Sequence, residues 1–144
     1  MATLDTKIFE ENVEVFFAKF PQIPYSFKEQ LVMYGPYLTL IGGILEIFNS
    51  GLLNTLNLGL QPFWLNNEIF FGTHYLFIFF SILVGAILIL SFKPLMAKKI
   101  TGWRMLLYAD LLYFIVSLIA GDIGGLVLNL VGLYLLFQIR KSYY

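Results

Sequence analysis

The longest uncharged apolar stretch of the chain, residues 69–92, constrains its fold more than any other feature. It is rich in Phe, Ile and Leu and is followed by Lys93. A helix of this length, rising about 1.5 Å per residue, exceeds the roughly 30 Å hydrocarbon core of a bilayer. The stretch therefore predicts a tilted membrane-spanning helix. An apolar fraction of 59% with only 12% charged residues is also atypical of a soluble protein, so we expect the bilayer to be the solvent.

Three further apolar stretches predict spans at residues 34–51, 102–120 and 123–139. Pro36 lies near the start of the first of these, where membrane helices tolerate a kink. Between the last two spans, Gly121 and Asp122 leave room only for a tight turn between antiparallel helices, with Asp122 as a predicted N-cap. With 144 residues, the chain has room for one membrane domain.

The segments outside these spans have their own patterns. Residues 52–67 alternate Leu with Asn, Gly and Gln, which favours an interfacial or short re-entrant segment. Ser26 and Glu29 have the spacing of a capping box, which predicts that a helix begins there and leads into the first span. We therefore divide the chain into an N-terminal segment, residues 1–25, and a four-span domain, residues 26–144.

Within the N-terminal segment, residues 5–20 carry apolar side chains at helical spacing and charged side chains on other faces. The apolar set comprises Ile8, Phe9, Val13, Phe16, Phe17 and Phe20. The charges prevent this helix from spanning, so we expect an amphipathic helix lying in the interface or against the bundle. The predicted fold class is thus all-α: a four-transmembrane-helix bundle with an N-terminal amphipathic interfacial helix.

The basic residues predict the orientation. All nine Lys and Arg fall within residues 7–28, 93–104 and 140–141, and these segments share one side if there are four spans. By the positive-inside rule, both termini and the 93–104 loop are predicted to be cytoplasmic. We expect no cleavable signal peptide, because the first 30 residues contain acidic groups and no continuous apolar core.

Three segments carry a resemblance to known proteins: residues 37–43 (YLTLIGG), 102–108 (GWRMLLY) and 132–140 (GLYLLFQIR). In these segments the chain resembles a group of small bacterial four-helix membrane proteins with no assigned activity. The resemblance covers residues 34–144 and implies a four-span fold with a basic central loop. It places the protein in the bacterial cytoplasmic (inner) membrane and brings no activity with it.

Polar residues inside the spans are candidate functional residues, because an ionised group there is costly. Glu46 is expected near the bilayer midplane, and Asp110 is expected to pair with Arg104 or Tyr108. Two interpretations stay open for Glu46: a structural carboxyl hydrogen-bonded within the bundle, or a proton- or cation-coupling site. If the two acids share a polar cavity, the side chains that could line it are Asn49, Ser117 and Asn129. The position of Glu46 in the first span is similar to that of the lone glutamate in the first helix of the small multidrug resistance transporters. The Thr and small residues that flank the glutamate in that family are missing here.

His74 is the only histidine, and the chain contains no Cys. One His cannot build a structural metal site, so we expect no metal. Because no catalytic motif occurs either, we expect no catalytic residues. His74 could instead hydrogen-bond at the outer interface or ligate a pigment. We therefore expect no cofactor other than a bound lipid or pigment. No phosphate-binding loop, metalloprotease motif or nucleophile elbow occurs, and the few basic residues argue against nucleic acid.

Glycines are predicted to mark close helix packing, because small residues let membrane helices approach. The candidates are Gly42, Gly43, Gly121, Gly125 and Gly132. The resulting functional hypothesis is a non-catalytic integral membrane protein, an accessory or scaffold subunit of a membrane assembly or a homo-oligomer in the lipid bilayer. The alternative is a small proton-coupled transporter that uses Glu46.

Overall fold

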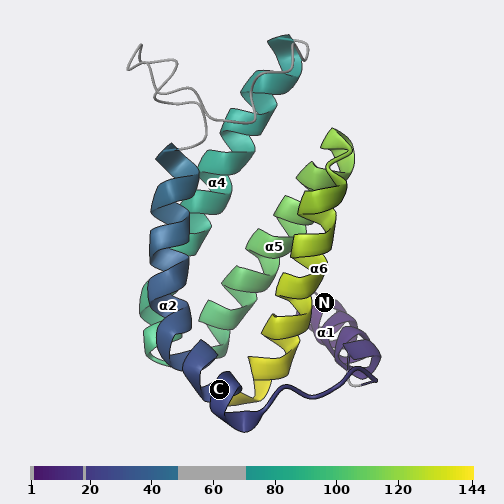
Figure 1. Ribbon diagram of the computed structural model, residues 1–144, viewed down its shortest axis with the longest axis vertical. Coiled ribbons are helices and arrows are strands. Elements are labelled where there is room, and N and C mark those ends of the chain that lie inside the picture. Colours follow the sequence, from purple (N-terminus) through teal and green to yellow (C-terminus); the bar gives the residue numbers. More distant parts are fainter. Residues whose placement is uncertain (1, 18, 49–70) are drawn as a thin grey trace.

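The structure, a computed structural model, describes residues 2–17, 19–48 and 71–144, and this part of the chain is helical (Figure 1). The helices are α1 (Ala2–Phe17), α2 (Tyr25–Ile47), α4 (Phe71–Met96), α5 (Ile100–Ala120) and α6 (Ile123–Ile139), followed by a 3₁₀ turn η2 (Arg140–Ser142). The segment 52–67, predicted to be interfacial or re-entrant, lies outside the described residues.

Four of these helices are long and apolar enough to cross a membrane: Tyr25–Ile47, Leu76–Met96, Ile100–Ala120 and Ile123–Ser142. The 23 residues of α2 alone extend for about 34 Å at the usual helical rise. The prediction of an all-helical chain with four helices able to span is therefore confirmed. The helix predicted to begin at Ser26 begins one residue earlier, at Tyr25, so α2 extends well before the span that was predicted from residue 34.

The four long helices pack in chain order, α2 on α4, α4 on α5 and α5 on α6, and α1 lies beside α6 (Figure 1). The ends of α4 and α6 and the beginnings of α2 and α5 lie at one end of the bundle, where the C-terminus also lies. Many large apolar side chains of the long helices point outward and are exposed, which suits contact with lipid tails.

Two glycines allow the closest contact between α2 and α4. A Cβ atom built on Gly43 would lie 2.8 Å from the carbonyl oxygen of Gly85, and one on Gly85 would lie 2.6 Å from a side-chain carbon of Ile47. Neither distance is compatible with a real side chain, so the two backbones touch because neither residue has one. Gly42 differs from its neighbour, since its Cβ would meet no atom within 4 Å; it makes no close contact here.

The turn between α5 and α6 follows from Gly121, which adopts a left-handed conformation with φ 67°. Its N–H bonds to the carbonyl of Leu118, and the Asp122 N–H bonds to that of Ser117 at 2.9 Å. This pair of bonds is a Schellman motif, which closes a helix at glycine. Asp122 occupies the predicted N-cap position of α6, but its side chain makes no capping hydrogen bond.

The capping box predicted at Ser26 and Glu29 does not form. Pro24 is the N-cap of α2, and no side chain caps the helix. The carbonyl of Pro24 accepts the first helical hydrogen bonds, from Phe27 and Lys28. Because α2 begins one residue before Ser26, that hydroxyl lies inside the first turn and cannot act as the cap.

The C-terminal residues close the polar end of the bundle. Backbone bonds of 2.9 Å join Ile100 to Tyr144 and Tyr144 to Lys98. Tyr143 is buried between these bonds and the 3₁₀ turn, and burial raises the pKa of its hydroxyl. The last residues of the chain are therefore held against the connection between α4 and α5.

Adjacent glycines give a matched test of the α2–α4 contact. We expect Gly43→Ala to lower the free energy of unfolding by about 1 to 3 kcal/mol, because the added methyl overlaps the α4 backbone. Gly42→Ala adds the same methyl one residue earlier into open space and should leave stability unchanged or raise it by up to about 1 kcal/mol. Thermal unfolding in detergent measures both, and equal midpoints for the two variants would contradict the close contact.

Candidate functional site

Among the described side chains, the most buried charged group is Glu10 of α1, which is only 2% exposed. Its carboxylate accepts a 2.8 Å bond from Nε of Arg104 and a 2.9 Å bond from a terminal nitrogen of Arg140. Arg140 also donates to Glu14, one turn further along α1. Two carboxylates and two guanidinium groups thus form a four-residue ion cluster that joins α1, the first turn of α5 and the end of α6.

The cluster rests on an aromatic base. Trp103 is fully buried and donates its indole N–H to the carbonyl of Leu136 at 2.8 Å. The guanidinium carbon of Arg140 lies 5.5 Å from the centre of the Trp103 ring, within the range of a cation–π contact. Phe137 lies edge-on to Trp103 and stacks on Phe17 of α1. The ion cluster and the aromatic core therefore hold α1 in the same place.

This arrangement changes the interpretation of α1. Its side toward the bundle carries Glu10, Val13, Glu14 and Phe17, whereas Ile8 and Phe16 of the predicted apolar stripe are 51% and 56% exposed. The stripe alone therefore does not define the buried face. The two glutamates stand four residues apart, on one face of a helix, and that spacing is the signal in the sequence that could have suggested a charged docking face.

Glu46 accepts a 2.9 Å hydrogen bond from the hydroxyl of Tyr113 on α5. This bond links the first pair of helices, α2 and α4, to the second pair, α5 and α6. Glu46 is the penultimate residue of α2, 21 residues after Tyr25, so it lies at one end of the described helix and not half-way along it. Tyr113 was not among the residues singled out from the sequence, since its partner is 67 positions away.

Asp110 does not pair with Arg104, which binds Glu10 instead. Six positions separate Arg104 from Asp110, and six positions rotate a helical side chain by about 240°, so the two point in different directions. The Asp110 carboxyl lies against Gly132 of α6, where a Cβ would come within 2.9 Å of one oxygen. Its other oxygen, Oδ2, is buried and has no hydrogen-bond partner among the described residues.

Ser117 and Asn129, predicted as candidates to line a polar cavity, lie together between α5 and α6. The amide nitrogen of Asn129 donates to the Ser117 hydroxyl at 3.3 Å and to the carbonyl of Gly125 at 2.8 Å. A Cβ on Gly125 would lie 2.7 Å from the Ser117 oxygen, so the glycine makes room for this pair. Both side chains are buried, and the bonds satisfy polar groups that would otherwise be orphaned.

Two predicted residues lie outside this description. Asn49 and the side chain of His74 are not among the described parts of the structure, so their hydrogen bonding and ligand roles stay predictions. Among the residues that are described, no group of three His, Asp or Glu side chains is arranged to hold a metal ion.

The ion cluster predicts a strong difference between neighbouring glutamates of α1. Glu10→Gln leaves Arg104 and Arg140 without their shared carboxylate, and we expect a loss of about 1 to 3 kcal/mol in the free energy of unfolding. Glu11→Gln removes the same charge from an exposed position, and its effect should stay within about 0.5 kcal/mol. Thermal unfolding of both variants in one detergent is the measurement. Equal losses would show that Glu10 acts only through the net charge of the helix.

Comparison of the chain with protein-family models, with curated proteins and with solved structures found no match. The comparisons therefore assign no family to the chain. The likeness to small four-helix bacterial membrane proteins remains a prediction from residues 37–43, 102–108 and 132–140, and the function has to be argued from the geometry above.

Proposed function

We propose that this protein is a non-catalytic integral membrane protein that acts as a scaffold or accessory subunit, as a homo-oligomer or within a larger membrane assembly. The observation that carries the proposal is how the polar side chains of the long helices are used. Glu46 is bonded to Tyr113, and Asn129 to Ser117. The buried Asn129–Ser117 pair satisfies polar groups between α5 and α6, and the Tyr113–Glu46 bond joins α5 to α2.

The outer surface supports the same proposal. Large apolar side chains are exposed along the outer sides of α2 and α6, among them Met33, Leu38 and Ile41 on α2 and Leu128 and Val131 on α6. Such surfaces suit lipid tails or the apolar helices of other membrane subunits. We further propose that α1 lies in the membrane interface, with Glu10 and Glu14 turned toward the bundle and Ile8, Val15 and Phe16 turned outward.

The proposed location is the bacterial cytoplasmic membrane, with both termini in the cytoplasm. Lys28 near the start of α2, Lys93 in the last turn of α4, Arg104 in the first turns of α5 and Arg140 after α6 gather at one end of the bundle. The turn at the other end of α5 carries Asp122 and no basic residue. The positive-inside rule assigns the basic end to the cytoplasm.

Because the chain contains no Cys, single introduced cysteines test this orientation directly. We expect Ala97→Cys, in the exposed connection between α4 and α5, to resist an impermeant maleimide in intact cells and to react after permeabilisation. Ala120→Cys, exposed at the opposite end of α5, should react in intact cells. The reverse pattern would place the termini outside.

The alternative function, a small proton-coupled transporter using Glu46, is favoured by a second intramembrane carboxyl: Oδ2 of Asp110 is buried and has no partner among the described residues. A carboxyl oxygen without a partner in a spanning helix is a candidate proton carrier. In a scaffold, Glu46 acts only as the acceptor of the Tyr113 hydrogen bond. In a transporter, Glu46 has to gain and lose a proton. Variants at the Glu46–Tyr113 pair therefore separate the two functions.

If the protein is a scaffold, Glu46→Gln should be tolerated, because the amide oxygen can still accept the hydrogen bond from Tyr113. Tyr113→Phe should lose about 0.5 to 1.5 kcal/mol of stability, and Glu46→Ala about 1 to 3 kcal/mol through the partner left unsatisfied. Thermal unfolding in detergent measures these changes, and native mass spectrometry of the same preparations reports whether the subunit associates. Loss of pH-driven uptake in a normally stable Glu46→Gln variant would instead establish the transporter.

A further inference from the structure

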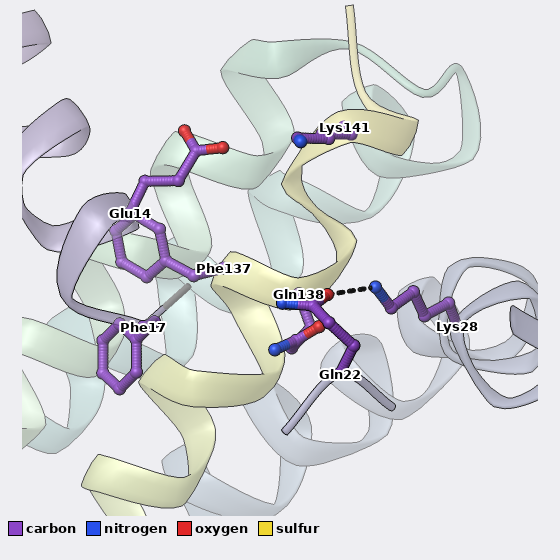
Figure 2. A pocket seen from close by; sticks show the side chains of 7 residues that line it. All are labelled: Glu14, Phe17, Gln22, Lys28, Phe137, Gln138 and Lys141. Carbon is purple, nitrogen blue, oxygen red and sulfur yellow. Dashed lines mark hydrogen bonds between the residues drawn. The ribbon is translucent and has the colours of Figure 1, made fainter. Parts of the chain in front are cut away.

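A small pocket opens at the basic end of the bundle, between α1, the start of α2 and the end of α6. Its lining includes Glu14, Lys28, Phe137, Gln138 and Lys141, and its volume is about 130 Å³ (Figure 2). Pockets for drug-sized ligands measure roughly 300 to 1,000 Å³. This pocket therefore has room for a small polar group only.

The floor of the pocket contains an unsatisfied acceptor. Gln138 is 8% exposed, and its amide oxygen is buried with no hydrogen-bond partner among the described residues. Leaving a buried acceptor unpaired is unfavourable unless a donor reaches it from outside the protein. A ligand that supplies an N–H or O–H group would remove that penalty once the Gln138 amide turns its oxygen toward the pocket.

The rim of the pocket carries a positive charge that the ion cluster does not neutralise. Glu14 is paired with Arg140, so its charge is already matched. Lys28 bonds only to the neutral Gln22 amide at 2.9 Å, and Lys141 has no ion pair within the described part of the chain. An ammonium group has three donors, so Lys28 can bind an anion without giving up Gln22.

We propose that this pocket binds the head group of a membrane phospholipid whose phosphodiester is followed by an amine or a hydroxyl. The phosphate binds Lys28, Lys141 adds positive charge from the other side of the pocket, and the amine or hydroxyl donates to Oε1 of Gln138. Phe17 and Phe137 form the apolar wall beside it. Basic pockets between membrane helices at the cytoplasmic surface are known to take anionic lipid head groups.

The location favours a lipid over a soluble phosphate. The pocket lies at the end of the bundle where α2 begins and α6 ends, beside the apolar outer surfaces of these two helices. A head group bound here can leave its acyl chains along those surfaces. Free inorganic phosphate offers the same anion but gains nothing from the apolar surroundings.

The experiment uses the full chain in mild detergent, titrated with dihexanoyl forms of phosphatidylethanolamine, phosphatidylglycerol and phosphatidylcholine, with the unfolding midpoint as the readout. Choline has no hydrogen-bond donor. Wild type should therefore bind the ethanolamine and glycerol lipids at least about fivefold more tightly than the choline lipid. Equal affinity for all three would overturn the role of Gln138.

Variants assign the binding to the pocket. Lys28→Gln with Lys141→Gln should weaken binding of all three lipids by about tenfold or more. Lys98→Gln with Lys99→Gln removes two exposed lysines at the same end of the bundle but outside the pocket lining, and it should weaken binding by less than about twofold. An equal loss in both double variants would mean that only the general positive field attracts lipid.

Gln138→Leu deletes the orphan acceptor and should abolish the preference over the choline lipid while leaving the midpoint of the lipid-free protein unchanged or raised. If that variant does not fold, Gln138→Glu tests the same contact in the opposite direction. The carboxylate attracts the ethanolamine ammonium group, so the preference for the ethanolamine lipid over the glycerol lipid should increase. An unchanged order of affinities in the variant that folds would overturn the proposal. Inorganic phosphate and glycerol phosphate serve as competitors, and full displacement of lipid by either at equal concentration would assign the site to a soluble phosphate.

Discussion

The arrangement at the polar end of the molecule depends on keeping the buried carboxylate of Glu10 charged. A carboxylate that is almost removed from solvent persists only when cations and hydrogen-bond donors surround it. Arg104 and Arg140 meet that requirement from two different helices, so the positions of α1, α5 and α6 are determined together. The cation–π contact of Arg140 with Trp103 extends the same constraint into the apolar core. A helix that its own composition would leave at the interface is thereby joined to the bundle.

The two pairs of long helices are stabilised by different physical means. In the first pair, α2 and α4, the closest contact lies between the backbones of Gly43 and Gly85; close packing must do this work because lipid tails are as apolar as the side chains. In the second pair, α5 and α6, a hydrogen bond lies within the interface, from Asn129 to Ser117, and the missing side chain of Gly132 leaves room for the Asp110 carboxyl. The hydrogen bond between Glu46 and Tyr113 joins the two pairs. It has the form of a structural link, since its donor and acceptor come from helices that belong to different pairs.

The sequence predicted what depends on local composition and missed what depends on tertiary placement. Hydropathy identified four long helices because an apolar window of sufficient length is a local property. Ser117 and Asn129 were named as candidates to line one polar cavity, but only the folded chain shows that they bond to each other. The partner of Arg104 was predicted wrongly, because helical rotation turns Asp110 away and because Glu10 lies 94 positions earlier in the chain. The capping box at Ser26 failed for a smaller reason, a helix start shifted by one residue. Gln138 was overlooked, because only the folded chain shows that its oxygen is buried without a donor.

The charge balance at the polar end connects orientation with lipid recognition. Glu10 and Glu14 match Arg104 and Arg140 one for one, so the arginines, although counted by the positive-inside rule, contribute little net field at the surface. The lysines therefore carry the excess charge, and two of them, Lys28 and Lys141, line the same pocket. In the proposed orientation, the charges that place this end at an anionic membrane surface are the ones proposed to bind individual phosphates there. The docking of α1 determines both features. Its glutamates neutralise the arginines, and its Phe17 forms one wall of the pocket that the two lysines line. The proposed orientation in the membrane and the proposed head-group site therefore both depend on how one N-terminal helix is bound.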